Sequence, residues 1–153
     1  MGDFEKFYNK ALEFLSYRPR SEKEVRDKLK TKKVELEVID RIISKLKEKK
    51  FINDEEFTKG WTESRLRFKP RSVRLIKLEL KQKGIDPETI NNLQLTIDND
   101  LESARKLVEK KIGRLEGLPK QEIYQKLGRY LASKGFDWDT IKKSIDAVLD
   151  KGV

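Results

Sequence analysis

An internal repeat restricts the possible folds of this chain more than any other feature of its sequence. Pro19, Pro70 and Pro119 lie 51 and 49 residues apart. Related residues surround the three prolines: Arg18-Pro19-Arg20-Ser21, Lys69-Pro70-Arg71-Ser72 and Leu118-Pro119-Lys120-Gln121. A period of this length is typical of stacked helical modules that bury their apolar faces against one another.

The apolar residues indicate that each repeat is helical. They recur at the spacing of an α-helix, as in Leu29, Val34, Val38, Ile42 and Leu46, and no segment shows the sustained alternation of a strand. Nine helices are predicted, near residues 3–17, 21–32, 35–49, 54–68, 70–83, 87–97, 99–115, 119–134 and 138–150. They form three sets of three, and a proline is expected to open the middle helix of each set. The sequence therefore predicts an all-α fold with three tandem three-helix repeats, at residues 1–53, 54–98 and 99–153, forming an elongated, curved array.

Several helix ends are marked by capping residues. Ser21 and Glu24 have the spacing of a capping box, in which each side chain accepts a hydrogen bond from a free backbone N–H. Asp86 precedes a proline, as expected at a helix start, and Gly84 and Gly135 are predicted to end helices. Isoleucines follow the three prolines after 20, 20 and 22 residues. This difference implies an insertion in the third middle helix or in the turn after it.

The composition argues against catalysis. The chain has no cysteine and no histidine, so disulfides are excluded and the usual ligands of zinc and the commonest general base are missing. We therefore expect no catalytic residues, no metal and no cofactor. No apolar run approaches the roughly 20 residues of a membrane helix, and the N-terminus lacks a signal-peptide pattern. The expected protein is cytoplasmic and acts by binding.

Positive charge is concentrated in the middle of the chain. The net charge is +9, and residues 59–83 hold nine basic residues against two acidic ones, a net of +7. Residues 1–58 have a net charge of +2, from 15 basic and 13 acidic residues, and residues 84–153 are neutral. A local field of this sign attracts polyanions or an acidic protein surface.

The candidate binding residues follow from this charge. A helix that starts at Pro70 would turn Val73, Ile76 and Leu80 toward the core and carry cations on another face. The predicted site comprises Arg65, Arg67, Lys69, Arg71, Arg74, Lys77 and Lys81, with Arg18 and Arg20 as the smaller counterpart in the first repeat. Arginine grips phosphate or carboxylate with two hydrogen bonds, so the arginines are the expected anchors.

Other residues near the basic segment receive structural interpretations. Phe68 is expected in the core, because aromatic residues at helical spacing are usually buried, whereas the position of Trp61 stays open. A second group of cations, Lys28, Lys30, Lys32 and Lys33, has acidic neighbours in the sequence and is expected only to solvate the fold.

Several motifs resemble those of a known family. Ala11-Leu12-x-x-Leu15, then Arg18-x-x-Ser21-x-x-Glu24-x-x-x-Lys28-Leu29, resembles the opening of the bacterial RecX regulatory family. Phe51-Ile52-Asn53-Asp54-x-x-Phe57 is similar to the family's Gly-Tyr-Leu-Asp-Asp-x-x-Phe signature, with Lys50 in place of the glycine. Arg65, Arg71 and Glu79-Leu80-x-x-Lys83-Gly84-Ile85 resemble its central module. The likeness covers nearly the whole chain and is strongest from residue 11 to residue 90.

The resemblance implies a function. Proteins of this family are tandem three-helix repeat proteins that bind the RecA recombinase and inhibit it, so the expected partner is the RecA filament on single-stranded DNA. We expect a monomer that blocks filament extension or destabilises the filament. Two alternatives remain open from the residues alone: a helical protein that binds DNA or RNA directly, and a basic scaffold that binds an acidic protein.

Overall fold

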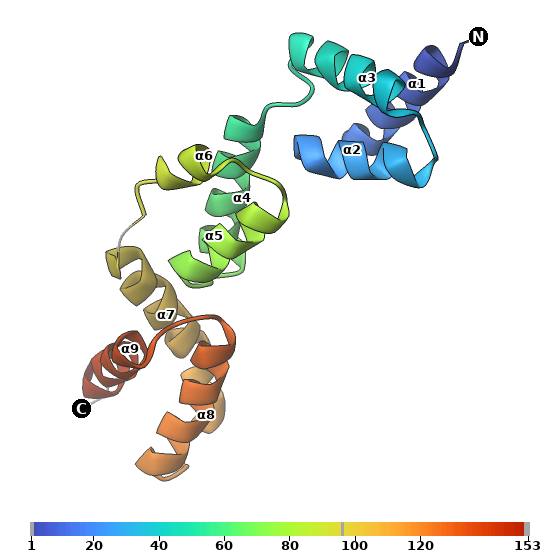
Figure 1. Ribbon diagram of the computed structural model, residues 1–153. Helices are drawn as coiled ribbons and strands as arrows, with labels where there is room; N and C mark the ends of the chain where they lie inside the picture. Colours follow the sequence, from blue (N-terminus) through green and yellow to red (C-terminus); the bar gives the residue numbers. More distant parts are fainter. Residues whose placement is uncertain (1, 96, 152–153) are drawn as a thin grey trace. The chain divides into compact units, whose positions relative to one another are not determined.

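The computed structural model describes residues 2–95 and 97–151, and all regular structure in these residues is helical. The helices are α1 (Asp3–Tyr17), α2 (Glu22–Thr31), α3 (Leu36–Glu48), α4 (Asp54–Phe68), α5 (Val73–Gln82), α6 (Pro87–Asn91), α7 (Ile97–Ile112), α8 (Lys120–Ser133) and α9 (Trp138–Lys151) (Figure 1). A 3-10 turn, Gly113–Leu115, follows α7. The predicted all-α fold, with three successive sets of three helices, is confirmed for the described residues.

The repeat is visible in the helix bounds. Helices α1 and α4 have 15 residues each and α2 and α5 have ten each, and the second of each pair starts 51 residues after the first. Helices α3, α6 and α9 begin at residues 36, 87 and 138, again 51 residues apart. Helix α8 has 14 residues, one turn more than α2 or α5. The predicted insertion therefore lies in the third middle helix, at its N-terminal end.

Some predicted helix bounds were wrong. Neither Pro19 nor Pro70 opens a helix, because the next serine caps it: Ser21 Oγ accepts the Glu24 N–H at 3.2 Å, and Ser72 Oγ accepts the Leu75 N–H at 3.1 Å. The predicted capping box is confirmed at Ser21. Helix α6 ends at Asn91 and not near residue 97, because the Asn92 N–H closes the last turn on the Glu88 and Ile90 carbonyls.

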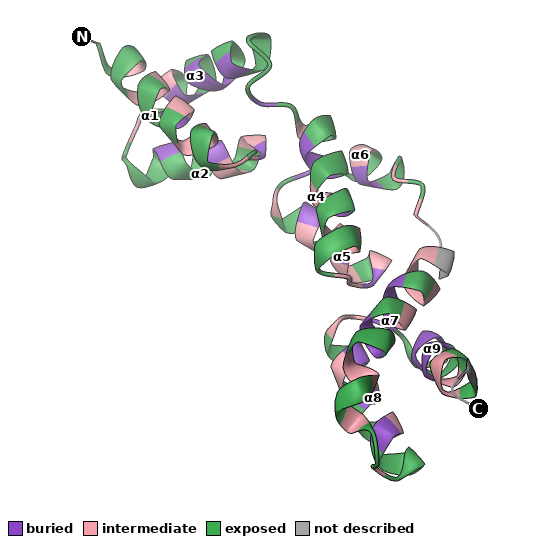
Figure 2. Cartoon of the chain, turned by 180° about the vertical axis from the view of Figure 1, so that it is seen from behind, coloured by how far each residue is buried: buried purple, intermediate pink, exposed green. Residues whose placement is uncertain are grey.

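The chain divides into two compact units, Met1–Trp61 with Leu80–Asn92 and Thr62–Glu79 with Leu93–Val153. In the first unit, α1, α2 and α3 enclose a core of Ala11, Val25, Leu29, Ile39, Ile42, Ile43, Leu46 and Ile52. In the second unit, α7, α8 and α9 enclose Ala104, Leu107, Val108, Ile123, Leu127, Leu131, Phe136, Ile141 and Ile145. Figure 2 shows the buried residues on the inner faces of both helix groups. Each buried Leu or Ile stabilises its core by roughly 1.5–3 kcal/mol.

Within the first unit, the start of one middle helix meets the end of the next. Ser21 Oγ, at the start of α2, donates a hydrogen bond to the Lys83 carbonyl oxygen, just after α5, at 2.7 Å. The Glu22 N–H donates to Asp54 Oδ1 at 2.9 Å. Gly84 has a φ of +79°, and a Cβ on it would lie 2.6 Å from Lys23 Cβ. We call this set of contacts the interrepeat joint.

The second unit contains an equivalent joint. The Ser72 N–H donates to the Lys134 carbonyl oxygen at 3.0 Å, and the Val73 N–H donates to Asp100 Oδ1 at 2.7 Å. Gly135 has a φ of +90°, and a Cβ on it would lie 2.4 Å from Ser72 Oγ. In both joints, free N–H groups at a helix start, which must find partners when they are buried, are satisfied by the following repeat.

The joint carboxylates titrate unusually because they are partly buried. Burial raises the pKa of Asp54, although the hydrogen bond from the Glu22 N–H opposes this effect. Burial also raises the pKa of Asp100, against the hydrogen bond from the Val73 N–H, and the nearby charge of Asp137 acts in the same direction as burial.

Candidate nucleic-acid interface

The two arginines expected as central anchors form an internal ion-pair cluster. Arg65, on the last turn of α4, and Arg71, just before α5, both contact Glu79 of α5. The closest distances to Glu79 Oε2 are 3.2 Å from Arg65 Nη2 and 2.9 Å from Arg71 Nη1. The three side chains are only 20%, 27% and 14% exposed, respectively. Glu79 therefore neutralises charge that the sequence pattern assigned to a ligand.

The residues between these two arginines face solvent. Arg67 and Lys69 are exposed, and Phe68 between them is 67% exposed. The Arg67 guanidinium lies over the Phe68 ring, 5.3 Å from its centroid. The prediction that Phe68 is buried was therefore wrong. It lies seven residues after Trp61 and so on the same face of α4, but the helix ends at Phe68 and leaves the ring exposed.

Trp61, whose position the sequence left open, is half-buried and packs within the first unit. Its ring stacks on Phe57 with 5.7 Å between centroids, and Lys83 Nζ lies 5.2 Å from its centroid. Of the two aromatic residues beside the basic segment, Phe68 is therefore the one that presents its ring to solvent.

The three predicted cations of α5 have different surroundings. Arg74 is exposed, and its Nη2 donates a long hydrogen bond of 3.4 Å to the Gly135 carbonyl oxygen at the second interrepeat joint. Lys77 is half-buried, and Lys81, one turn further along α5, is exposed. The helix therefore carries the predicted stripe of cations, with Arg74 also engaged in the joint.

The first-repeat counterparts are held by their own module. Arg18 forms an ion pair with Glu24 and donates to the Pro19 carbonyl oxygen at 2.8 Å. Burial would raise the pKa of Glu24, but hydrogen bonds from Arg18 and from the Ser21 N–H outweigh burial and lower it. The Arg20 guanidinium stacks on the Phe14 ring at 3.8 Å from its centroid. Burial and the nearby charge of Arg18 lower the pKa of Arg20.

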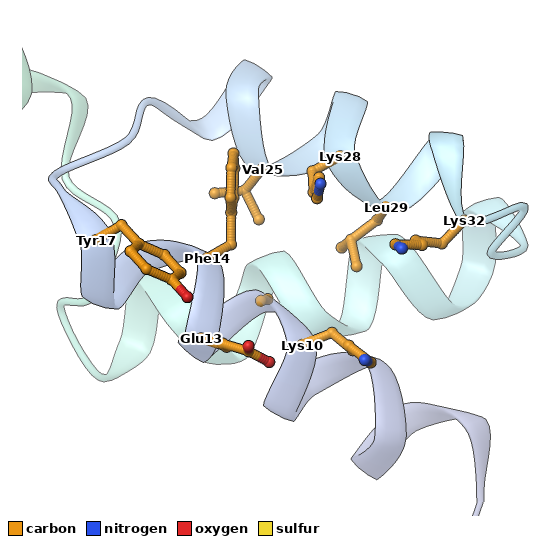
Figure 3. A pocket seen from close by; sticks show the side chains of 9 residues that line it. Lys10, Glu13, Phe14, Tyr17, Val25, Lys28, Leu29 and Lys32 are labelled. Carbon is orange, nitrogen blue, oxygen red and sulfur yellow. The ribbon is translucent and has the colours of Figure 1, made fainter.

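A cationic hollow between α1 and α2 was missed by the sequence analysis (Figure 3). It has a volume of about 190 Å³, and Phe14, Tyr17, Val25 and Leu29 supply most of its apolar lining. The remaining lining residues are Lys10, Ala11, Glu13, Lys28 and Lys32. The signal was in the sequence: Lys10, Phe14 and Tyr17 follow one face of α1, and Lys28 and Lys32 lie one turn apart on α2. Two lysines that had been interpreted only as solvating residues thus line a hollow.

The described surface offers binding chemistry, namely exposed cations beside aromatic rings. Among residues 2–95 and 97–151, no cluster of three side chains could hold a metal ion. No helix in that part of the chain is long and apolar enough to cross a membrane.

Three successive helix triplets, with middle helices joined end to start, define an all-α helical repeat protein built from three-helix modules. The family models for the first, second and third three-helix domains of RecX match residues 8–46, 53–92 and 98–145. The chain belongs to the RecX family.

Individual relatives support this assignment. The chain is 37% identical to a regulatory protein RecX from Bacillus velezensis and 34% identical to that of Bacillus subtilis, over 94% and 95% of its length. It spans only 56% of the length of each of these relatives. The crystal structure of RecX from Lactobacillus salivarius superposes with a TM-score of 0.77 and 31% identity, covering 95% of this chain and 96% of that one.

Proposed function

We propose that the protein is a non-enzymatic regulator that binds RecA filaments on single-stranded DNA and inhibits the recombinase. The inhibited activities are filament extension, strand exchange, ATP hydrolysis and the co-protease activity of the SOS response. Membership of the RecX family and the relatives named regulatory protein RecX support this role in the control of recombination and DNA repair. The protein acts as a cytoplasmic monomer without a cofactor.

The observation that carries the proposal is the pair of exposed cations on either side of an exposed aromatic ring, Arg67 and Lys69 beside Phe68. A RecA filament presents DNA phosphates together with protein surface, and these cations suit phosphate contacts. Each contact with a single strand should lower the logarithm of the affinity by roughly 0.7 for a tenfold rise in salt. Lys77 and Lys81 extend the same basic surface along α5.

Reversing the charge of the exposed pair tests the proposal. The double variant Arg67→Glu with Lys69→Glu should abolish inhibition of strand exchange and leave the helical circular dichroism unchanged, because both side chains are exposed. The matched control is Lys120→Glu with Lys126→Glu, which makes the same charge change at exposed positions of α8. Arg71→Glu is unsuitable, because it would place a second carboxylate beside Glu79 and destabilise the fold.

Binding measurements with three ligands separate the proposal from its alternatives. The ligands are naked single strand, RecA alone and the assembled filament. Tightest binding to the filament supports the proposal. Equal affinity for naked strand and filament would instead make the protein a direct nucleic-acid binder, and equal affinity for RecA alone and filament would make it a protein scaffold.

A further inference from the structure

An exposed aromatic ring recurs at the same position in the first two repeats. Tyr17 is the last residue of α1 and is 76% exposed, and Phe68 is the last residue of α4 and is 67% exposed. The two residues are 51 residues apart, which is the repeat length, and each is followed by a cation and a proline. In the third repeat the residue two places before the proline is Gly117, so the ring is absent there.

Each ring is accompanied by cations. In the second unit, Arg67 lies over Phe68 and the exposed Lys69 follows it. In the first unit, Tyr17 borders the hollow whose rim carries Lys10, Lys28 and Lys32. All three lysines are exposed.

The two repeats differ in how the cations beside the ring are neutralised. Lys28 on α2 holds the position that Glu79 holds on α5, 51 residues later. Glu79 pairs with two arginines in the second repeat, whereas the equivalent place in the first repeat adds a positive charge. The first repeat therefore keeps its cations for a ligand, and the second repeat keeps only those that flank Phe68.

We infer that Tyr17 and Phe68 stack on unpaired bases of single-stranded nucleic acid, while the neighbouring cations contact its phosphates. A strand repeats a flat base and a negative charge at every nucleotide, which matches a ring beside cations repeated in successive modules. A cationic surface for an acidic protein would not need the rings. This inference deepens the proposed function, on which it rests, by naming the residues that contact the strand.

The test compares two probes of equal charge at low salt: an oligothymidylate and an oligonucleotide of the same length made of abasic residues. Tyr17→Ala and Phe68→Ala should each weaken binding of the full chain to oligothymidylate by about fivefold or more, the low end of measured base stacking. Binding to the abasic strand and the salt dependence should not change, because the phosphate contacts remain. Tyr17→Phe and Phe68→Trp should retain the affinity.

The control is Trp138→Ala. Trp138 is 65% exposed but stands between Asp137 and Asp139, where a phosphate would be repelled, so its removal should not affect binding. The inference is overturned if the double variant Tyr17→Ala with Phe68→Ala binds oligothymidylate like the wild type, or loses the same factor on both probes. It is also overturned if the wild type does not bind naked strand at low salt. In each of these cases filament binding, measured separately, decides whether the proposed function stands.

Discussion

A substitution at Gly135 should show how much the second interrepeat joint contributes to stability. Gly135→Ala puts a Cβ 2.4 Å from Ser72 Oγ and 3.1 Å from Leu75 Cβ, distances that force the joint to open. Gly117→Ala is a matched control, because Gly117 has a φ of +89°, close to the +90° of Gly135, and has no atom within 4 Å of a built Cβ. The two variants therefore share the backbone strain but differ in crowding.

The expected magnitudes follow from the contacts. A left-handed φ costs a residue with a Cβ about 1–2 kcal/mol. A more restricted unfolded chain returns about 0.4–1 kcal/mol when glycine is replaced by alanine. Gly117→Ala should thus lower the free energy of unfolding by about 1 kcal/mol or less. Gly135→Ala should cost about 1–3 kcal/mol more, because it displaces the Ser72 cap and the hydrogen bond from the Ser72 N–H to the Lys134 carbonyl oxygen.

Urea unfolding, followed by the helical circular dichroism signal, measures both variants. A double variant that adds Ser72→Ala to Gly135→Ala should lose less stability than the sum of the single changes, since removing the hydroxyl also removes the closest clash. Equal destabilisation by alanine at positions 135 and 117 would refute the reasoning, because the close approach would then carry no energetic weight.

Three further predictions concern single residues. Lys50 has a φ of +62°, so Lys50→Gly should raise the free energy of unfolding by about 0.5–1 kcal/mol in a urea titration. Glu79→Gln should lower stability by about 1–3 kcal/mol, because it leaves two half-buried arginines without their carboxylate, and should tighten binding to oligothymidylate; weaker binding would contradict the neutralising role of Glu79. Acid should act in two stages: stability contributed by Glu24, whose pKa is lowered, is lost as the pH falls below the ordinary glutamate pKa and through the folded one, whereas the raised pKa of Asp100 makes its protonation at milder acid favourable to folding. Glu24→Gln should remove the first of these effects from the pH dependence of unfolding.

Local chemistry made much of the fold predictable. Apolar periodicity placed α1 and α4 at their observed bounds, because each helix needs only its own residues to define a buried face. The capping box at Ser21 and the left-handed glycines at 84 and 135 were also predictable, since caps depend on residues within one turn. The start of α5 was misplaced because a proline and a serine both favour a helix start, and the serine cap prevailed.

The candidate site was less predictable, because it depends on contacts between segments. Charge counting found the basic segment but could not show that Glu79 reaches two arginines that precede it by 14 and 8 residues. The exposure of Phe68 depends on where α4 ends and on what lies beyond it. The hollow beside Tyr17 needs α1 and α2 in contact. In each case the deciding information is the packing of helices, which periodicity within one helix does not contain.

The interrepeat joint also bears on self-association. At the end of α2, the position equivalent to Gly84 and Gly135 is Lys33, whose φ is +59°. A side chain there would collide with an incoming serine-capped helix, as a Cβ would at Gly135. The start of α8 in turn has Pro119 as its N-cap and no side-chain capping bond. Copies of the chain therefore lack both complementary surfaces for head-to-tail growth through this joint, so the contact that orders the repeats within one molecule does not propagate into a fibre.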